Sequence, residues 1–176
     1  GYRSPCALWF QLSAYDDGSE HIHVIDEINH EHNIKSQDFA RRIMAKPYNI
    51  LKYYGDIAGG QVQGQSGVGD IELFRNYGIN VRYARDRISR SIRTGIDHIR
   101  GFFENAEGVR RIHIDKSCKS FINDLESYRY PEDKSGKPIK EEPLKDGICD
   151  HSMDAMRYFF INHFPIRGGK IRVIKR

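Results

Sequence analysis

Hydrophobic and polar positions along the chain predict alternating strands and helices. Residues 6–28 begin with a run of β-forming side chains, turn at the polar residues 16–19, and continue with alternating polar and apolar positions. This pattern is typical of a pair of strands joined by a tight turn. Helical spacing of apolar residues and short β-forming runs then predict further elements, in the order helix 36–46, strand 50–56, helix 69–78, strand 79–84, helix 89–104, strand 109–114, helix 118–128 and helix 149–160.

A strand pair followed by alternating helices and strands predicts an α/β layered domain. Its central sheet should mix parallel and antiparallel strands, with helices flanking it. The 176 residues suit one domain, 1–176, with a single core. Within it, residues 130–146 carry prolines, glycines and dense charge and predict an exposed excursion, and 165–176 form a basic tail.

Composition and cysteine content predict a soluble protein of a reducing compartment. No stretch of 18 apolar residues and no secretory signal pattern occurs in the sequence. The three cysteines are far apart and odd in number, which favours free thiols in the cytoplasm.

Basic residues are concentrated in one part of the chain. The net charge is only +4, but the segment 82–119 holds ten Lys or Arg against five Asp or Glu. Two interpretations stay open, a solvated face and a surface that contacts phosphates. The candidate DNA-contacting residues are Arg85, Arg87, Arg90, Arg93 and Lys116.

The helix predicted at 149–160 carries acids beside its apolar face. Met153, Met156 and Phe160 recur at helical spacing, whereas Asp150 and Asp154 fall on an adjoining stripe. Acids on an otherwise buried helix suggest a metal-binding edge.

A second candidate acid, Asp56, stands where a strand ends and a glycine-rich loop begins. The ends of strands are where α/β sheets bind ligands, although a turn or helix-capping aspartate is the alternative. The loop lacks the lysine and spacing of a nucleotide-binding loop. Asp56 and Asp154 could converge on two Mg²⁺ or Mn²⁺ ions, which prefer oxygen ligands and can activate water for phosphodiester hydrolysis.

Two stretches resemble a known family. "YYGDIAG" at 53–59 and "DHSMDAMRYFF" at 150–160 look like the second and third acidic motifs of the C-terminal nuclease domain of tailed-bacteriophage terminase large subunits, in the ribonuclease H-like superfamily. "GYRSPCALWFQ" at 1–11 resembles the first strand after the family's first motif, and "RISRSIRTGIDHIRGFF" at 87–103 a helix that follows the middle of the sheet.

The resemblance implies a metal-dependent endonuclease that cuts concatemeric viral DNA in the host cytoplasm. It also implies an N-terminal packaging ATPase, a small terminase subunit and a portal as partners. Asp56 and Asp154 match the second and third metal-binding acids, and His151 matches a histidine found near the metals in some members. Asp150 is a possible auxiliary ligand. The first acid is expected directly before Gly1, so a chain starting at Gly1 should bind metal weakly and be impaired in cleavage.

Two other functions remain as alternatives. A Holliday-junction resolvase-like nuclease would prefer four-way junctions to linear duplex. A non-catalytic DNA-binding or packaging interaction module would bind duplex equally with and without EDTA and never nick it. The histidines at 21, 23, 30, 32, 113 and 163 have no cysteine partners that would favour a zinc site.

Overall fold

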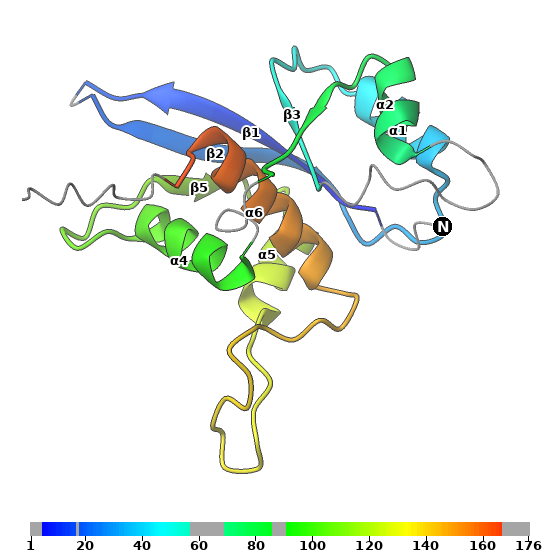
Figure 1. Ribbon diagram of the computed structural model, residues 1–176. Coiled ribbons are helices and arrows are strands. Elements are labelled where there is room, and N and C mark those ends of the chain that lie inside the picture. Colours follow the sequence, from blue (N-terminus) through cyan, green and yellow to red (C-terminus); the bar gives the residue numbers. More distant parts are fainter. Residues whose placement is uncertain (1–4, 17, 57–68, 86–90, 167–176) are drawn as a thin grey trace, which may run out of the picture.

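The computed structural model describes residues 5–16, 18–56, 69–85 and 91–166, and its helices and strands are shown in Figure 1. The elements in chain order are β1 (Ala7–Ala14), β2 (Glu20–Ile28), α1 (Ser36–Met44), β3 (Tyr53–Tyr54), α2 (Asp70–Asn76), β4 (Val81–Arg82), α4 (Ile92–Phe103), β5 (Ile112–Ile114), α5 (Lys119–Ser127) and α6 (Asp150–His163).

The first sheet has the strand order β1-β2-β5. β1 and β2 are antiparallel, and β2 and β5 are parallel, so this sheet mixes both kinds of pairing. A register shift between Trp9 and Phe10 leaves Ile25 of β2 without a partner on β1. On β1, Leu8, Phe10 and Leu12 all pack against the main core, whereas Ile25 packs against the smaller cluster around Trp9.

The main core lies between this sheet and helices α4, α5 and α6. Buried apolar side chains of β2 pack with those of the three helices, as Ile22, Val24, Ile99, Phe102, Phe121, Met153, Met156, Phe159 and Phe160. Phe10 stacks on Phe159 with ring centroids 3.9 Å apart. Figure 1 shows α4, α5 and α6 together below the sheet. The long apolar face of α6 therefore forms the centre of the domain.

A second, two-stranded parallel sheet pairs β3 with β4 and lies beside α1 and α2 (Figure 1). A smaller cluster of Trp9, Ile28 and Phe39 joins α1 to the first sheet. α6 contacts both β1 and β3, so this helix spans the two sheets.

The predicted α/β fold with a mixed sheet is confirmed, and each predicted strand and helix has a counterpart in the structure. The described strands are grouped as the mixed sheet β1-β2-β5 and the separate strand pair β3-β4. β3 is shorter than the predicted strand 50–56. Residues 132–142 are exposed, with an isolated bridge between Glu132 and Pro138, and residues 167–176 of the predicted tail lie outside the described residues.

Within the described part of the chain, no helix combines the length and apolar character needed to cross a membrane.

Candidate active site

A cavity of about 240 Å³ brings the two predicted acids together. It is lined by residues of the β3 end, β4 end, α4, α6 and the segment before α6, namely Gly55, Asp56, Ala84, Ile92, Lys145, Asp154, Arg157, Tyr158 and Ile161. Asp56 and Asp154 are 98 positions apart in the chain, by subtraction of their numbers. The fold thus places both carboxylates on the wall of one small cavity.

Asp56 reaches the cavity because β3 and β4 run very close together. The backbone N–H of Gly55 donates to the carbonyl of Arg82 at 3.0 Å. A Cβ at Gly55 would lie 2.8 Å from Cγ1 of Val81, closer than side chains tolerate. Glycine therefore lets the strand pair to its last residue, and Asp56 follows at the end of β3.

Asp154 is held by an arginine one turn further along α6. Nη2 and Nε of Arg157 donate to Oδ1 of Asp154 at 2.7 and 3.2 Å. The side chain of Arg157 is 7% exposed and that of Asp154 28%. Burial by itself lowers the pKa of Arg157, but the charge and hydrogen bond of Asp154 outweigh it and raise that pKa. Arg157 engages one carboxylate oxygen, and Oδ2 has no hydrogen bond to the described residues.

A glycine on the neighbouring helix makes room for this arginine. A Cβ at Gly95 of α4 would lie 2.7 Å from both Cγ and Cδ of Arg157. The aliphatic stem of Arg157 therefore lies directly on the α4 backbone, and its guanidinium lies 4.8 Å from the ring centre of Tyr158. The close packing of α4 on α6 fixes the orientation of the guanidinium that holds Asp154.

Tyr158, the next residue of α6, interacts with the other acid. Burial raises the pKa of Tyr158 most, followed by the negative charges of Asp154 and Asp56. A phenol with a raised pKa stays protonated and can donate a hydrogen bond to a carboxylate. Arg157 thus holds Asp154, and Tyr158 lines the same cavity as Asp56.

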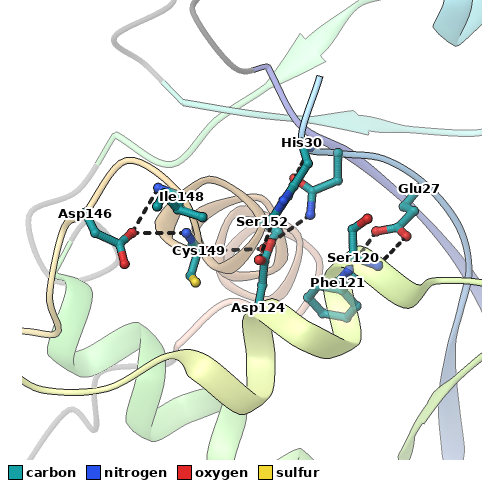
Figure 2. A network of polar contacts seen from close by, with 10 residues as sticks. Glu27, His30, Ser120, Phe121, Asp124, Asp146, Ile148, Cys149 and Ser152 are labelled. Carbon is teal, nitrogen blue, oxygen red and sulfur yellow. Dashed lines mark hydrogen bonds and ion pairs between the residues drawn. The ribbon is translucent and has the colours of Figure 1, made fainter. Parts of the chain in front are cut away.

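The start of α6 is tied to the core by a buried carboxylate on α5 (Figure 2). Asp124 is 1% exposed. Its Oδ2 accepts hydrogen bonds from Ser152 at 2.6 Å and from Asn29 at 2.7 Å, and its Oδ1 lies 2.6 Å from Nε2 of His30. Just before α6, Oδ1 of Asp146 accepts from the backbone N–H groups of residues 148 and 149 at 2.9 and 3.1 Å. These contacts fix the first turn of the helix that carries Asp154.

Asp150 and His151 lie in that first turn but do not line the cavity. Oδ1 of Asp150 is buried and has no hydrogen-bond partner among the described residues. Burial raises the pKa of Tyr128 to about 12, and the nearby negative charges of Asp154 and Asp150 contribute to this increase. The proposed roles of Asp150 and His151 stay predictions.

The donors in the cavity suit a hard divalent cation that keeps much of its water. Asp56 and the Oδ2 atom of Asp154 offer carboxylate oxygens, which Mg²⁺ and Mn²⁺ prefer. The described residues contain no group of three or more His, Cys, Asp or Glu side chains arranged to hold a metal. Asp56 and Asp154 alone are thus a partial ligand set, completed by water or by groups outside the described residues.

The predicted DNA-contacting residues are only partly gathered near the cavity. Arg85 is exposed, next to the cavity residue Ala84, and its guanidinium lies 5.5 Å from the ring centre of Tyr83. Arg93 follows the cavity residue Ile92 but is ion-paired with Glu141 at 2.7 Å. Lys116 is exposed between β5 and α5 and does not line the cavity. The remaining two, Arg87 and Arg90, lie outside the described residues.

A larger hollow of about 490 Å³, between α4 and the excursion, is a poorer candidate. Its two acids, Asp97 and Glu141, are exposed and ion-paired with Arg100 and Arg93. This hollow contains neither of the two predicted acids, whereas the smaller cavity contains both, so the smaller cavity is the better site.

Three polar or charged lining residues, Lys145, Arg157 and Tyr158, were not predicted from the sequence as parts of the site. Arg157 and Tyr158 lie three and four positions after Asp154, so the helical spacing could have placed both beside it. Lys145 gave no signal, since it is one of several lysines in a charged segment.

Comparison with known proteins agrees with the resemblance seen in the sequence. No protein-family model and no curated protein sequence matches the chain. Among solved structures, the large terminase nuclease domain of bacteriophage SPP1, with bound Mn, matches with a TM-score of 0.61 and 20% identity over 93% of this chain and 82% of that one. The nuclease domain of the P22 large terminase matches with a TM-score of 0.59 and 16% identity over 92% and 81% of the two chains. The chain therefore shares its fold with the nuclease domains of these two large terminases.

Proposed function

We propose that this chain is the endonuclease domain of a viral genome-packaging terminase and cuts concatemeric DNA by metal-dependent phosphodiester hydrolysis. The observation that carries the proposal is the meeting of Asp56 and Asp154 on one cavity, in a fold shared with two terminase nuclease domains. Asp56 and Asp154 would hold two Mg²⁺ or Mn²⁺ ions, with Asp150 as an auxiliary ligand and His151 nearby. The manganese of the SPP1 structure supports a divalent metal.

Bound divalent cations would supply Lewis acidity towards the phosphate and a water of lowered pKa. The protein's own residues would orient the carboxylates. Arg157 fixes Asp154 through Oδ1, so that Oδ2 would be available to a ligand, and Tyr158 lines the cavity together with Asp56. Side chains fixed in this way lose little freedom when substrate binds.

The proposed substrate is double-stranded DNA, contacted through its backbone by the basic segment 82–119. Arg85 and Arg93 flank residues of the cavity wall, so phosphates on either side of the cut would lie within their reach. Contacts of this kind read no base sequence and weaken with salt. The packaging ATPase, the small terminase subunit and the portal are the proposed protein partners.

A plasmid-nicking assay with Mn²⁺ tests the proposal. We expect nicking by the chain, none in EDTA, and a loss of at least roughly 100-fold in Asp56→Asn and Asp154→Asn, because each removes a charged metal ligand. The matched control is Asp97→Asn, which makes the same chemical change at an exposed α4 residue paired with Arg100 and should nick normally.

Equal nicking by Asp154→Asn and the control would overturn the metal-site assignment. Duplex binding that EDTA leaves unchanged, without nicking by any version, would point to the interaction module. Preferential cutting of four-way junctions over linear duplex would point to a resolvase-like nuclease.

A further inference from the structure

The cavity that holds the two acids also receives a lysine from the segment leading into α6. Lys145 lines the same space as Asp56 and Asp154, although it belongs to the charged excursion and not to a helix or strand. Its side chain has no hydrogen-bond or ion-pair partner within the described residues. Lys145 is exposed, so its ammonium is solvated when no ligand is bound and is available to an incoming anion.

The backbone on both sides of Lys145 is anchored. The N–H of Leu144 donates to the carbonyl of Arg129 at 2.9 Å, which closes the base of the excursion. Pro143 is buried, and Asp146 accepts two backbone hydrogen bonds at the start of α6. Lys145 therefore sits at a fixed point of the excursion, unlike Lys134 near its exposed tip.

The other cation of the cavity, Arg157, already forms an ion pair with Asp154. Arg157 is buried and gives two hydrogen bonds to Oδ1 of Asp154, so its guanidinium is committed to positioning that carboxylate. Among the described residues that line the cavity, Lys145 is then the one cation free to meet an incoming anion. Lysine acts as a compact point charge on a flexible stem, which suits contact with a phosphate oxygen.

We propose that Lys145 is a catalytic residue that binds a non-bridging oxygen of the scissile phosphate and stabilises the charge that develops there during hydrolysis. This inference rests on the proposed nuclease function. In the reaction, the oxygen of a water molecule bonds to phosphorus and the bond from phosphorus to the leaving sugar oxygen breaks. One proton of the water passes to that oxygen through solvent. Lys145 stays protonated throughout and takes no part in the proton transfer.

Two measurements on Lys145→Gln test the assignment, with Lys134→Gln as the matched control for the loss of one lysine from the same excursion. In single-turnover nicking at saturating DNA, the rate of Lys145→Gln should fall on the order of 10- to 100-fold. This is no more than the usual loss when one hydrogen-bond donor to the transition state is removed, because the lysine is exposed. Its affinity for uncut duplex in Ca²⁺ should change no more than that of the control. A loss of affinity with an unchanged rate would overturn the catalytic role.

The second measurement needs neither DNA nor cleavage. Removing a positive charge from the cavity should strengthen Mn²⁺ binding to Asp56 and Asp154. The affinity is measured by electron paramagnetic resonance, which reports the concentration of free Mn²⁺. We expect tighter binding in Lys145→Gln and no change in Lys134→Gln. If the unaltered chain nicks DNA but both lysine variants match it in rate and in Mn²⁺ affinity, this inference fails alone. If the unaltered chain neither nicks nor binds Mn²⁺, the proposed function fails and the inference with it.

Discussion

Replacing Gly95 by alanine tests whether the packing of α4 on α6 positions Asp154. The added Cβ would lie 2.7 Å from Cγ and Cδ of Arg157, whose side chain is 7% exposed and cannot simply swing into solvent. Gly101, on the same helix, is an internal control, because a Cβ there meets nothing within 4 Å. Both changes are Gly→Ala in α4, so differences between them report the contact with Arg157.

The size of the effect follows from two opposing contributions. Alanine in place of glycine in a helix favours the folded state by about 1 kcal/mol, and Gly101→Ala should show this gain. At Gly95 the same gain is opposed by overpacking, which typically costs about 1–3 kcal/mol. The helical gain cancels in the comparison, so Gly95→Ala should be less stable than Gly101→Ala by about 1–3 kcal/mol. For a chain of this length each kcal/mol corresponds to about 2–4 °C in Tm.

Urea unfolding of the two variants and the unaltered chain measures this difference in stability. Titration with Mn²⁺ shows whether the substitutions also change the metal affinity of the site. Gly95→Ala should also bind Mn²⁺ more weakly, because the charge of Arg157 stays in the site while Asp154 loses its fixed orientation and must be ordered when the ion binds. Gly101→Ala should bind as the unaltered chain does. Equal stabilisation by both alanines would refute the close contact between Gly95 and Arg157. Lower stability with unchanged Mn²⁺ affinity would refute the positioning role of that contact.

Two further predictions concern the α5 carboxylate and the exposed histidines. Asp124→Ala should lower the free energy of unfolding by about 2–4 kcal/mol, because it leaves buried donors without an acceptor, whereas Ser152→Ala should cost about 1 kcal/mol. Urea unfolding of the pair tests this, and a loss below that of Ser152→Ala would contradict it. Burial, with the nearby His23 and His21, lowers the pKa of His113, so the unfolded chain takes up a proton first as the pH falls. Stability should therefore decline from about pH 6.5 downwards, and His113→Gln should make that decline shallower in unfolding curves between pH 7.5 and 5.5. An identical slope in the variant would count against this linkage.

Much of the fold could be predicted because local patterns agree with tertiary packing. The alternation in residues 20–28 matches a strand with Ile22 and Val24 turned into the core, and the spacing of Met153, Met156 and Phe160 matches the buried face of α6. Sheet organisation could not be predicted in the same way. The register shift at Trp9 and the separation of β3 from β1 depend on pairings between distant segments, which leave no periodic signal.

The candidate site was predictable where a residue's chemistry is unusual for its position. Asp56 stood out as an acid before a glycine-rich loop, and Asp154 as an acid on an apolar helix. Lys145 and Gly95 did not stand out, since a lysine in a charged loop and a glycine in a helix are ordinary locally. Their importance arises only when the chain folds and places one on the cavity wall and the other against Arg157.

The positions that support the site converge on α6, and this makes its stability and its proposed chemistry inseparable. Arg157 and Tyr158 are consecutive residues of the helix, and Arg157 holds Asp154 while Tyr158 lines the cavity together with Asp56. The start of the helix is fixed by Asp124, and its middle by the glycine contact with α4. Because the helix is a rigid element, a shift at either anchor moves Asp154 with respect to Asp56 at the end of β3, and a displacement of about 1 Å is enough to impair a site that depends on geometry. Variants at the anchors should therefore lose Mn²⁺ affinity in proportion to their effect on α6, while substitutions of equal cost in the Trp9 cluster should lower stability and leave Mn²⁺ affinity unchanged.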